Sequence, residues 1–198
     1  MPRCPAPFCP SRRLAAAAAL LLCCAAAQAA GPTATACPAL LQHTLPRLQD
    51  EKPIDLCQHA GKVLLVVNTA SYCGYTPQYK SLEALHAQYR SRGLVVLGFP
   101  SNDFSQEPGS SAQIADFCEN TFGVKFPMFA KSHVVPGTGG AVNPLFLALQ
   151  QRSGQVPKWN FHKYLVSRAG DRVSSYASSV DPKDPAFIQD LEKLLKAN

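Results

Sequence analysis

The chain has 198 residues, of which 46% are hydrophobic and 16% charged, a balance typical of a globular protein and unlike that of a disordered one. This length allows one domain with a sizeable core and is short for two. The formal net charge is +6, and it falls to +3 when the three arginines of residues 1–30 are set aside. So small a charge, without a basic run interleaved with aromatic residues, argues against a nucleic-acid-binding protein.

The N-terminal 30 residues have the composition of a secretory signal sequence. Three arginines precede an apolar run over residues 14–27, and Ala27-Gln28-Ala29 has the small residues of a signal-peptidase site. We therefore expect residues 1–29 to be removed and the protein to be exported, either to the periplasm or out of the cell. The run is short for a transmembrane anchor, and Arg12-Arg13 leaves both the general and the twin-arginine export routes open.

Export changes how the eight cysteines are counted. Four of them would leave with the signal sequence, and four would remain: Cys37, Cys57, Cys73 and Cys118. An even number of cysteines in an oxidising compartment favours disulfides. Cys37 and Cys57 flank part of an N-terminal segment, residues 30–60, that has little core of its own. We predict a structural disulfide between them; the alternative is a pair of unlinked thiols.

The first regular elements follow this segment. Five consecutive apolar residues, 63–67, predict a strand that is buried on both faces of a sheet. Thr76-Pro77 has the pattern of a helix N-cap followed by proline in the first helical position, and apolar residues three and four apart continue the helix to Tyr89. A second apolar strand over 94–99 fits a parallel pair with the first.

Cys73 lies on the turn between the first strand and this helix. The N-terminal end of a helix favours a thiolate, which is the reactive form of cysteine. Gly74 and the polar residues of the turn predict an accessible position rather than a core position. A buried structural cysteine is the common alternative, but the location favours a reactive Cys73.

The later elements complete an α/β domain. They are a capped helix from Ser110, a short helix from Asn143, strands over 161–166 and 173–176 joined by a tight turn, and a final helix from Asp184. The order β-α-β-α-β-β-α predicts a thioredoxin-like fold over residues 61–198, with a central mixed sheet flanked by helices.

The turn lacks the second cysteine of a disulfide exchanger. Thioredoxin-type enzymes carry it three residues after the first, and here that position is Thr76. A lone thiolate on this turn suits attack on a peroxide oxygen. That reaction leaves a sulfenic acid, which another thiol must resolve.

Four stretches of the sequence resemble motifs of the glutathione peroxidase family, in order and at family spacing, within residues 50–195. They are NTASYCGYTPQY at 68–79, LGFPSNDFSQEPG at 97–109, FGVKFPMFAK at 122–131 and KWNFHKYLV at 158–166. The first has cysteine where some members have selenocysteine. The resemblance implies a thiol-dependent peroxidase that reduces hydrogen peroxide and organic or lipid hydroperoxides in response to oxidative stress.

The resemblance also implies roles for individual residues. Cys73 is the peroxidatic nucleophile, and Trp159 and Asn160 donate hydrogen bonds that stabilise its thiolate. The alternative for Trp159 is an ordinary core aromatic, although Asn160 after it is unusual for a core strand. Asp103 stands where the family has a catalytic glutamine, and an ionised carboxylate would disfavour a nearby thiolate. Asp103 is therefore protonated, turned away from the sulfur, or a proton acceptor.

Cys118 is the candidate resolving cysteine, because some thiol-only members of the family place one in this helix region. Its apolar neighbours Ile114 and Phe117 support a buried structural cysteine equally well. If Cys118 resolves Cys73, the helix must unwind locally for the two sulfurs to reach bonding distance.

The remaining expectations concern partners and alternative functions. The long insertion of tetrameric members is missing, which implies a monomer with an open site. The thiol reductant is glutathione, a thioredoxin-like protein or another thiol. We expect no cofactor and no metal, because the five histidines lack ligand spacing. The alternatives are a non-catalytic peroxide-sensing or redox-binding module, which Asp103 favours, and a disulfide oxidoreductase, which Thr76 disfavours.

Overall fold

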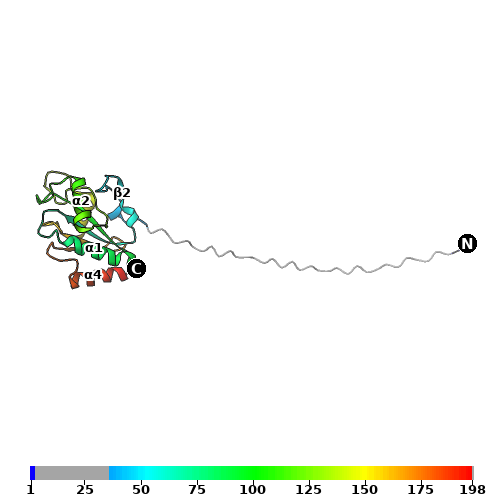
Figure 1. The fold of residues 1–198 in the computed structure, drawn as a ribbon. Coiled ribbons are helices and arrows are strands. Elements are labelled where there is room, and N and C mark those ends of the chain that lie inside the picture. The colour runs from blue at the N-terminus through cyan, green and yellow to red at the C-terminus, as the bar shows by residue number, and fades with distance from the viewer. Residues whose placement is uncertain (3–35, 198) are drawn as a thin grey trace. The chain divides into compact units, whose positions relative to one another are not determined.

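The computed structural model describes residues 1–2 and 36–197, and Figure 1 shows the fold. Apart from its first two residues, the expected signal sequence lies outside the described residues. From residue 36 onward the described chain belongs to one compact unit. None of the helices described there has both the length and the hydrophobicity that crossing a membrane requires.

The centre of the unit is a four-stranded mixed sheet. Its strand order is β4-β3-β5-β6, and the strands are β3 (Val63–Thr69), β4 (Leu94–Pro100), β5 (Lys163–Val166) and β6 (Val173–Tyr176). β3 runs parallel to β4 and antiparallel to β5, which is in turn antiparallel to β6. All seven residues of β3 are buried, as predicted for a strand that is covered on both faces.

Helices cover both faces of this sheet. The helices are α1 (Gln78–Tyr89), α2 (Ser111–Phe122), α3 (Pro144–Ser153) and α4 (Pro185–Lys196). The odd-numbered residues of β3 from 63 to 67 share a buried cluster with α1, α2 and α4, whereas Leu64 and Val66 share another with α3. Successive side chains of a strand point to opposite faces, so α3 lies on the face opposite the other three helices. This arrangement confirms the predicted architecture.

The segment before the sheet packs onto the same face as α3. Two short 3-10 helices, η1 (Ala39–Leu41) and η2 (Leu56–His59), flank the hairpin of β1 (Thr44–Pro46) and β2 (Pro53–Asp55). The predicted disulfide between Cys37 and Cys57 is present, with an S–S distance of 2.02 Å. Three leucines of η1 and η2 enter the α3 cluster, which gives the segment the core that it lacks by itself.

Two element boundaries near Cys73 differ from the prediction. α1 begins at Gln78, not at Pro77, and the Thr76 side chain does not cap it. Instead, the Thr76 hydroxyl accepts a hydrogen bond from the Cys73 N–H at 3.0 Å and donates one to the Ala70 carbonyl at 2.9 Å. β5 begins two residues later than predicted because Phe161 has a φ of +63°, a left-handed conformation that is incompatible with an extended strand.

Candidate active site

Cys73 lies at the carboxyl end of β3, on the turn that leads into α1. The Tyr75 N–H donates a hydrogen bond to the Cys73 sulfur at 3.4 Å. The residue is 8% exposed, whereas the neighbouring Tyr72 is 71% exposed. Cys73 is therefore less accessible than the polar residues of the turn predicted, and it belongs to the buried cluster on the α1 face of the sheet.

Gln106 is the residue that links the Cys73 turn to Asn160. Its backbone carbonyl accepts a hydrogen bond from the Tyr72 N–H at 3.1 Å. Its side-chain oxygen accepts one from the Asn160 amide at 2.9 Å. Gln106 is not among the site residues that the sequence predicted, although a glutamine three residues after Asp103 is a visible signal within the 97–109 motif.

The Asp103 carboxylate is bound by a different loop. One oxygen accepts hydrogen bonds from the N–H groups of Val134 and Val135, at 2.6 and 2.9 Å, and the other lies 2.6 Å from His133 Nδ1. The side chain is 1% exposed. Burial raises the pKa of Asp103, but the hydrogen bonds outweigh burial and hold this pKa below its ordinary value. Of the three alternatives, the geometry matches an ionised carboxylate that is turned toward residues 133–135.

Asn68, near the end of β3, anchors the segment that carries the other two predicted site residues. Its amide donates a hydrogen bond to the Trp159 carbonyl at 3.2 Å, and its carbonyl accepts one from the Phe161 N–H at 2.6 Å. Trp159 and Asn160 are therefore brought to the same end of β3 as Cys73.

The two side chains of this segment differ in exposure. Asn160 is fully buried, whereas Trp159 is 41% exposed and packs against Phe104, with ring centroids 5.3 Å apart. Trp159 is thus not a core aromatic. Among residues 36–197, neither the Trp159 indole nor the Asn160 amide donates a hydrogen bond to Cys73, whose sulfur accepts one from Tyr75. The structure brings the three residues to one region without forming the bonds that the family resemblance implies.

Cys118 lies in α2 and belongs to the same buried cluster as Cys73. Both cysteines are free thiols in this structure. Burial raises the pKa of Cys118 to about 11; the charge of Glu107 adds to this effect, and the Tyr79 hydroxyl opposes it. Cys118 is therefore protonated at neutral pH while α2 is intact.

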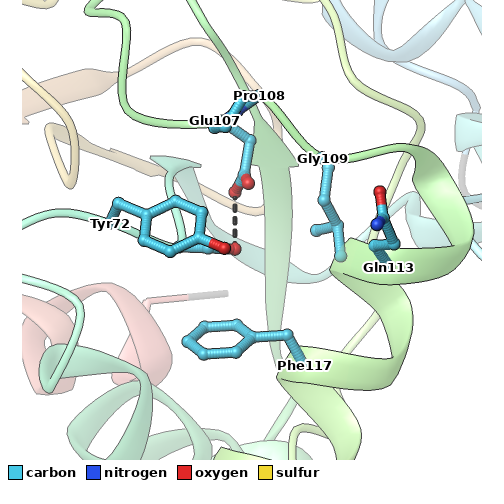
Figure 2. A pocket seen from close by; sticks show the side chains of 8 residues that line it. Tyr72, Glu107, Pro108, Gly109, Gln113 and Phe117 are labelled. Carbon is cyan, nitrogen blue, oxygen red and sulfur yellow. Dashed lines mark hydrogen bonds between the residues drawn. The ribbon is translucent and has the colours of Figure 1, made fainter.

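A cavity of about 290 Å³ lies between the Cys73 turn and α2 (Figure 2). Ser71 and Tyr72 line it from the turn, and Ile114 and Phe117 line it from α2. The buried Glu107 carboxylate accepts a hydrogen bond from the Ser71 hydroxyl at 3.0 Å, shown as the dashed line in Figure 2. The cavity thus separates the two segments that carry the free cysteines.

A larger groove of about 660 Å³ borders Trp159. Tyr75, Val156, Lys158 and Ala177 are among its lining residues, together with several serines, and no carboxylate lines it. Burial lowers the pKa of His162, which also lines the groove, to about 4, so Lys158 supplies the charge there at neutral pH. Nowhere in the described part of the chain do three histidine, cysteine or acidic side chains gather as metal ligands would.

Known proteins resemble this chain in both sequence and structure. The family model described as glutathione peroxidase matches residues 41–150. A glutathione peroxidase-like peroxiredoxin of Schizosaccharomyces pombe is 44% identical over 155 residues, which are 76% of this chain and 95% of that protein. A hydroperoxy fatty acid reductase of Synechocystis is 46% identical over 157 residues, or 74% and 90% of the two chains. A thioredoxin-family thiol:disulfide interchange protein from Chlorobium tepidum aligns with a TM-score of 0.59 at 15% identity, over 77% of this chain and 92% of its own, which shows that the fold is thioredoxin-like.

Proposed function

The chain belongs to the glutathione peroxidase family and is a thiol-dependent peroxidase, and we propose that Cys73 is its peroxidatic nucleophile. The observation that carries this proposal is the position of Cys73 on the strand-to-helix turn, where its sulfur accepts the Tyr75 N–H. Position 76, which holds the second cysteine in a disulfide exchanger, is a threonine whose hydroxyl is engaged by the turn itself.

The first step of the proposed reaction is attack by the Cys73 thiolate on the terminal oxygen of a hydroperoxide. The S–O bond forms as the O–O bond breaks, and the electron pair leaves with an alkoxide or hydroxide, which takes up a proton. Cys73 becomes a sulfenic acid. We propose that the amide of Asn160 and the indole of Trp159, which lie at the same end of β3 as Cys73, support negative charge during this step, although neither donates to the Cys73 sulfur before peroxide binds.

In the second step, the Cys118 thiolate attacks the sulfenic sulfur. A Cys73–Cys118 disulfide forms, and hydroxide leaves and is protonated to water; an external thiol then reduces the disulfide. This assignment is supported by the membership of both cysteines in one buried cluster. Because burial raises the pKa of Cys118 to about 11, the step requires α2 to open so that the thiol can ionise and approach.

The decisive experiment adds one equivalent of hydrogen peroxide to the reduced active-site cysteines, with the Cys37–Cys57 bond intact. Trp159 fluorescence follows the reaction, and intact mass with peptide mapping identifies the product. We expect a fast change that Cys73→Ser abolishes, and a final Cys73–Cys118 disulfide. In Cys118→Ser the fast change should remain and end in a sulfenic acid. The absence of any reaction in the wild type would refute the peroxidase assignment for Cys73.

A second measurement, of turnover with excess peroxide and excess thiol, separates catalysis from peroxide sensing. A non-catalytic sensor would react once and then fail to consume further peroxide in the presence of excess thiol. Asp103 was the sequence feature that favoured a sensor. Its carboxylate is engaged by His133, Val134 and Val135, so it gives no support to that alternative.

The groove beside Trp159 supports organic hydroperoxides as substrates in addition to hydrogen peroxide. It has the volume for an acyl or aryl group, and one relative is named a hydroperoxy fatty acid reductase. Ala177→Trp should fill the groove and raise the KM for cumene hydroperoxide about tenfold or more, because a bulky substrate loses its binding space. The rate with hydrogen peroxide should change little.

Ala87→Trp, at an exposed position on α1, is the matched control and should leave both substrates unaffected. An equal loss of rate with both peroxides in Ala177→Trp would show that the groove does not bind the organic group.

We further propose that the enzyme acts after export, as a monomer, in the response to oxidative stress. The composition of residues 1–29 and the Cys37–Cys57 disulfide support export. Cell fractionation with N-terminal sequencing tests this, and the expected result is an extracytoplasmic protein that begins at Ala30. Sedimentation of the purified protein tests the monomer.

A further inference from the structure

Lys163 is a buried amine that the reaction described above does not use. It is the first residue of β5, and its side chain is fully buried. Leu165, two residues further along the strand, belongs to the cluster on the α1 face, so Lys163 also points toward that face. In residues 36–197 it belongs to no ion pair. Because burying an amine without an ion-pair partner is unfavourable, a compensating role is expected.

The contacts of the Lys163 amine are two backbone carbonyls. Nζ donates hydrogen bonds to the Phe161 carbonyl at 2.6 Å and to the Ser178 carbonyl at 3.3 Å. Ser178 also accepts a hydrogen bond at 2.8 Å from the side chain of Gln78, the first residue of α1. Burial lowers the pKa of Lys163 to about 7, against the influence of Asp181. A protonated lysine amine has three N–H donors and a neutral one has two. Both carbonyls can therefore be bound in either protonation state.

Phe161 is the strained residue of the segment that carries the site. Its φ of +63° is rare for a large side chain, and such strain persists only where the surroundings hold it. Asn68 accepts the Phe161 N–H and donates to the Trp159 carbonyl, while Lys163 donates to the Phe161 carbonyl. Both the N–H and the carbonyl of the strained residue, Phe161, are thus bound by hydrogen bonds, which hold the turn after Asn160.

We propose that Lys163 is a positioning residue for the peroxidase site, which holds Trp159 and Asn160 at the end of β3 through its hydrogen bond to the Phe161 carbonyl. Lys163 affects the reacting atoms only by holding this turn in place, and it does not touch the substrate. The effect on rate rests on the proposed function, whereas the effect on the position of Trp159 does not.

Lys163→Met tests this proposal because methionine keeps an unbranched, uncharged side chain but donates no hydrogen bond. Trp159 is the only tryptophan of the chain, so its emission maximum and its quenching by acrylamide report on the turn before any peroxide is added. We expect emission at longer wavelength and stronger quenching than in the wild type. The rate of Cys73 oxidation by peroxide should fall about 10- to 100-fold, as a small misplacement of a site group can cause.

Val166→Ala, at the opposite end of β5, is the matched control. It removes buried apolar atoms from the same strand, so it lowers stability without touching residues 159–161. Its Trp159 emission, quenching and peroxide rate should match the wild type. If Lys163→Met does not fold, Lys163→Gln is measured in its place and judged by the same outcomes. The glutamine side chain is one bond shorter than that of lysine, so its amide cannot reach both carbonyls.

The outcomes separate the two proposals. Wild-type fluorescence in the Lys163 variant, or changed fluorescence with a wild-type peroxide rate, would overturn the positioning role. If the wild-type protein itself does not react with peroxide, the proposed function fails. The fluorescence comparison would still show whether Lys163 holds the turn.

Discussion

At the scale of single residues, the site depends on which side chain of the 101–109 loop reaches Asn160. Gln106 accepts the Asn160 amide hydrogen at 2.9 Å. That contact fixes the orientation of the amide, which keeps a second N–H available. Asp103, at the position where the family resemblance places a glutamine, contacts the 133–135 segment instead.

Gln106→Ala should therefore lower the rate of Cys73 oxidation about tenfold, since losing one orienting hydrogen bond amounts to about 1.4 kcal/mol. Asp103→Asn should keep the wild-type rate within about twofold, because it leaves the Gln106–Asn160 contact intact. Stopped-flow fluorescence of Trp159 after mixing with peroxide measures both rates. The reverse ranking of the two variants would return the catalytic role to Asp103.

The sequence was sufficient to place Cys73 on a turn between a buried strand and a helix, because local pattern alone predicts those elements. It was insufficient to choose between Asp103 and Gln106. A loop can follow a slightly different path without any change in the composition or periodicity of its sequence. Such a difference changes which of its side chains faces the site. That choice depends on tertiary contacts, in this case the two N–H groups of Val134 and Val135.

At the scale of elements, Asp103 joins two loops that follow different parts of the fold. Its backbone belongs to the loop after β4, and its carboxylate holds residues 133–135, ahead of α3. Asp103→Asn should lower the free energy of unfolding by about 2 kcal/mol at pH 7, because it weakens several charge-assisted hydrogen bonds. Urea unfolding, followed by circular dichroism, measures the difference.

The pH dependence of this effect has a defined sign. The pKa of Asp103 lies below its ordinary value of 3.8 in the folded protein. The stabilisation is therefore complete above pH 3.8 and disappears as the pH falls through the lower, folded-state pKa. Asp116→Asn, an exposed carboxylate on α2, is the control and should change stability by less than about 0.5 kcal/mol. A difference for Asp103→Asn that persists unchanged below pH 3 would contradict this account.

Elements were easier to predict than their ends. The helices that the sequence indicated from Ser110 and from Asp184 both begin directly after those residues, which cap them. The start of β5 differs from the prediction, because Phe161 adopts a left-handed conformation that local preference disfavours. The Asn68 carbonyl, which accepts the Phe161 N–H, and the Lys163 amine, which donates to the Phe161 carbonyl, stabilise this conformation. Asn68 is distant in sequence, and Lys163 lies in a strand whose pattern gives no sign of this contact.

At the scale of the whole unit, one face of the central sheet is covered in part by a segment that precedes the sheet in the chain. The two 3-10 helices of this segment contribute three leucines, Leu40, Leu41 and Leu56, to the cluster that also contains α3. The Cys37–Cys57 bond closes a loop of 20 residues around this contribution. It lies on the α3 face, whereas Cys73 belongs to the cluster on the other face, so its contribution to stability is separable from the reaction.

The double variant Cys37→Ser with Cys57→Ser should therefore unfold with a free energy about 3 kcal/mol lower than the oxidised wild type, mainly because its unfolded chain is less constrained. Its rate of Cys73 oxidation should equal that of the wild type under conditions where both are folded. Dithiothreitol should lower the stability of the wild type to that of the variant and leave the variant unchanged. Equal stability of the oxidised and reduced wild type would show that the three leucines hold the segment without the bond. The disulfide would then no longer support an oxidising location for the enzyme.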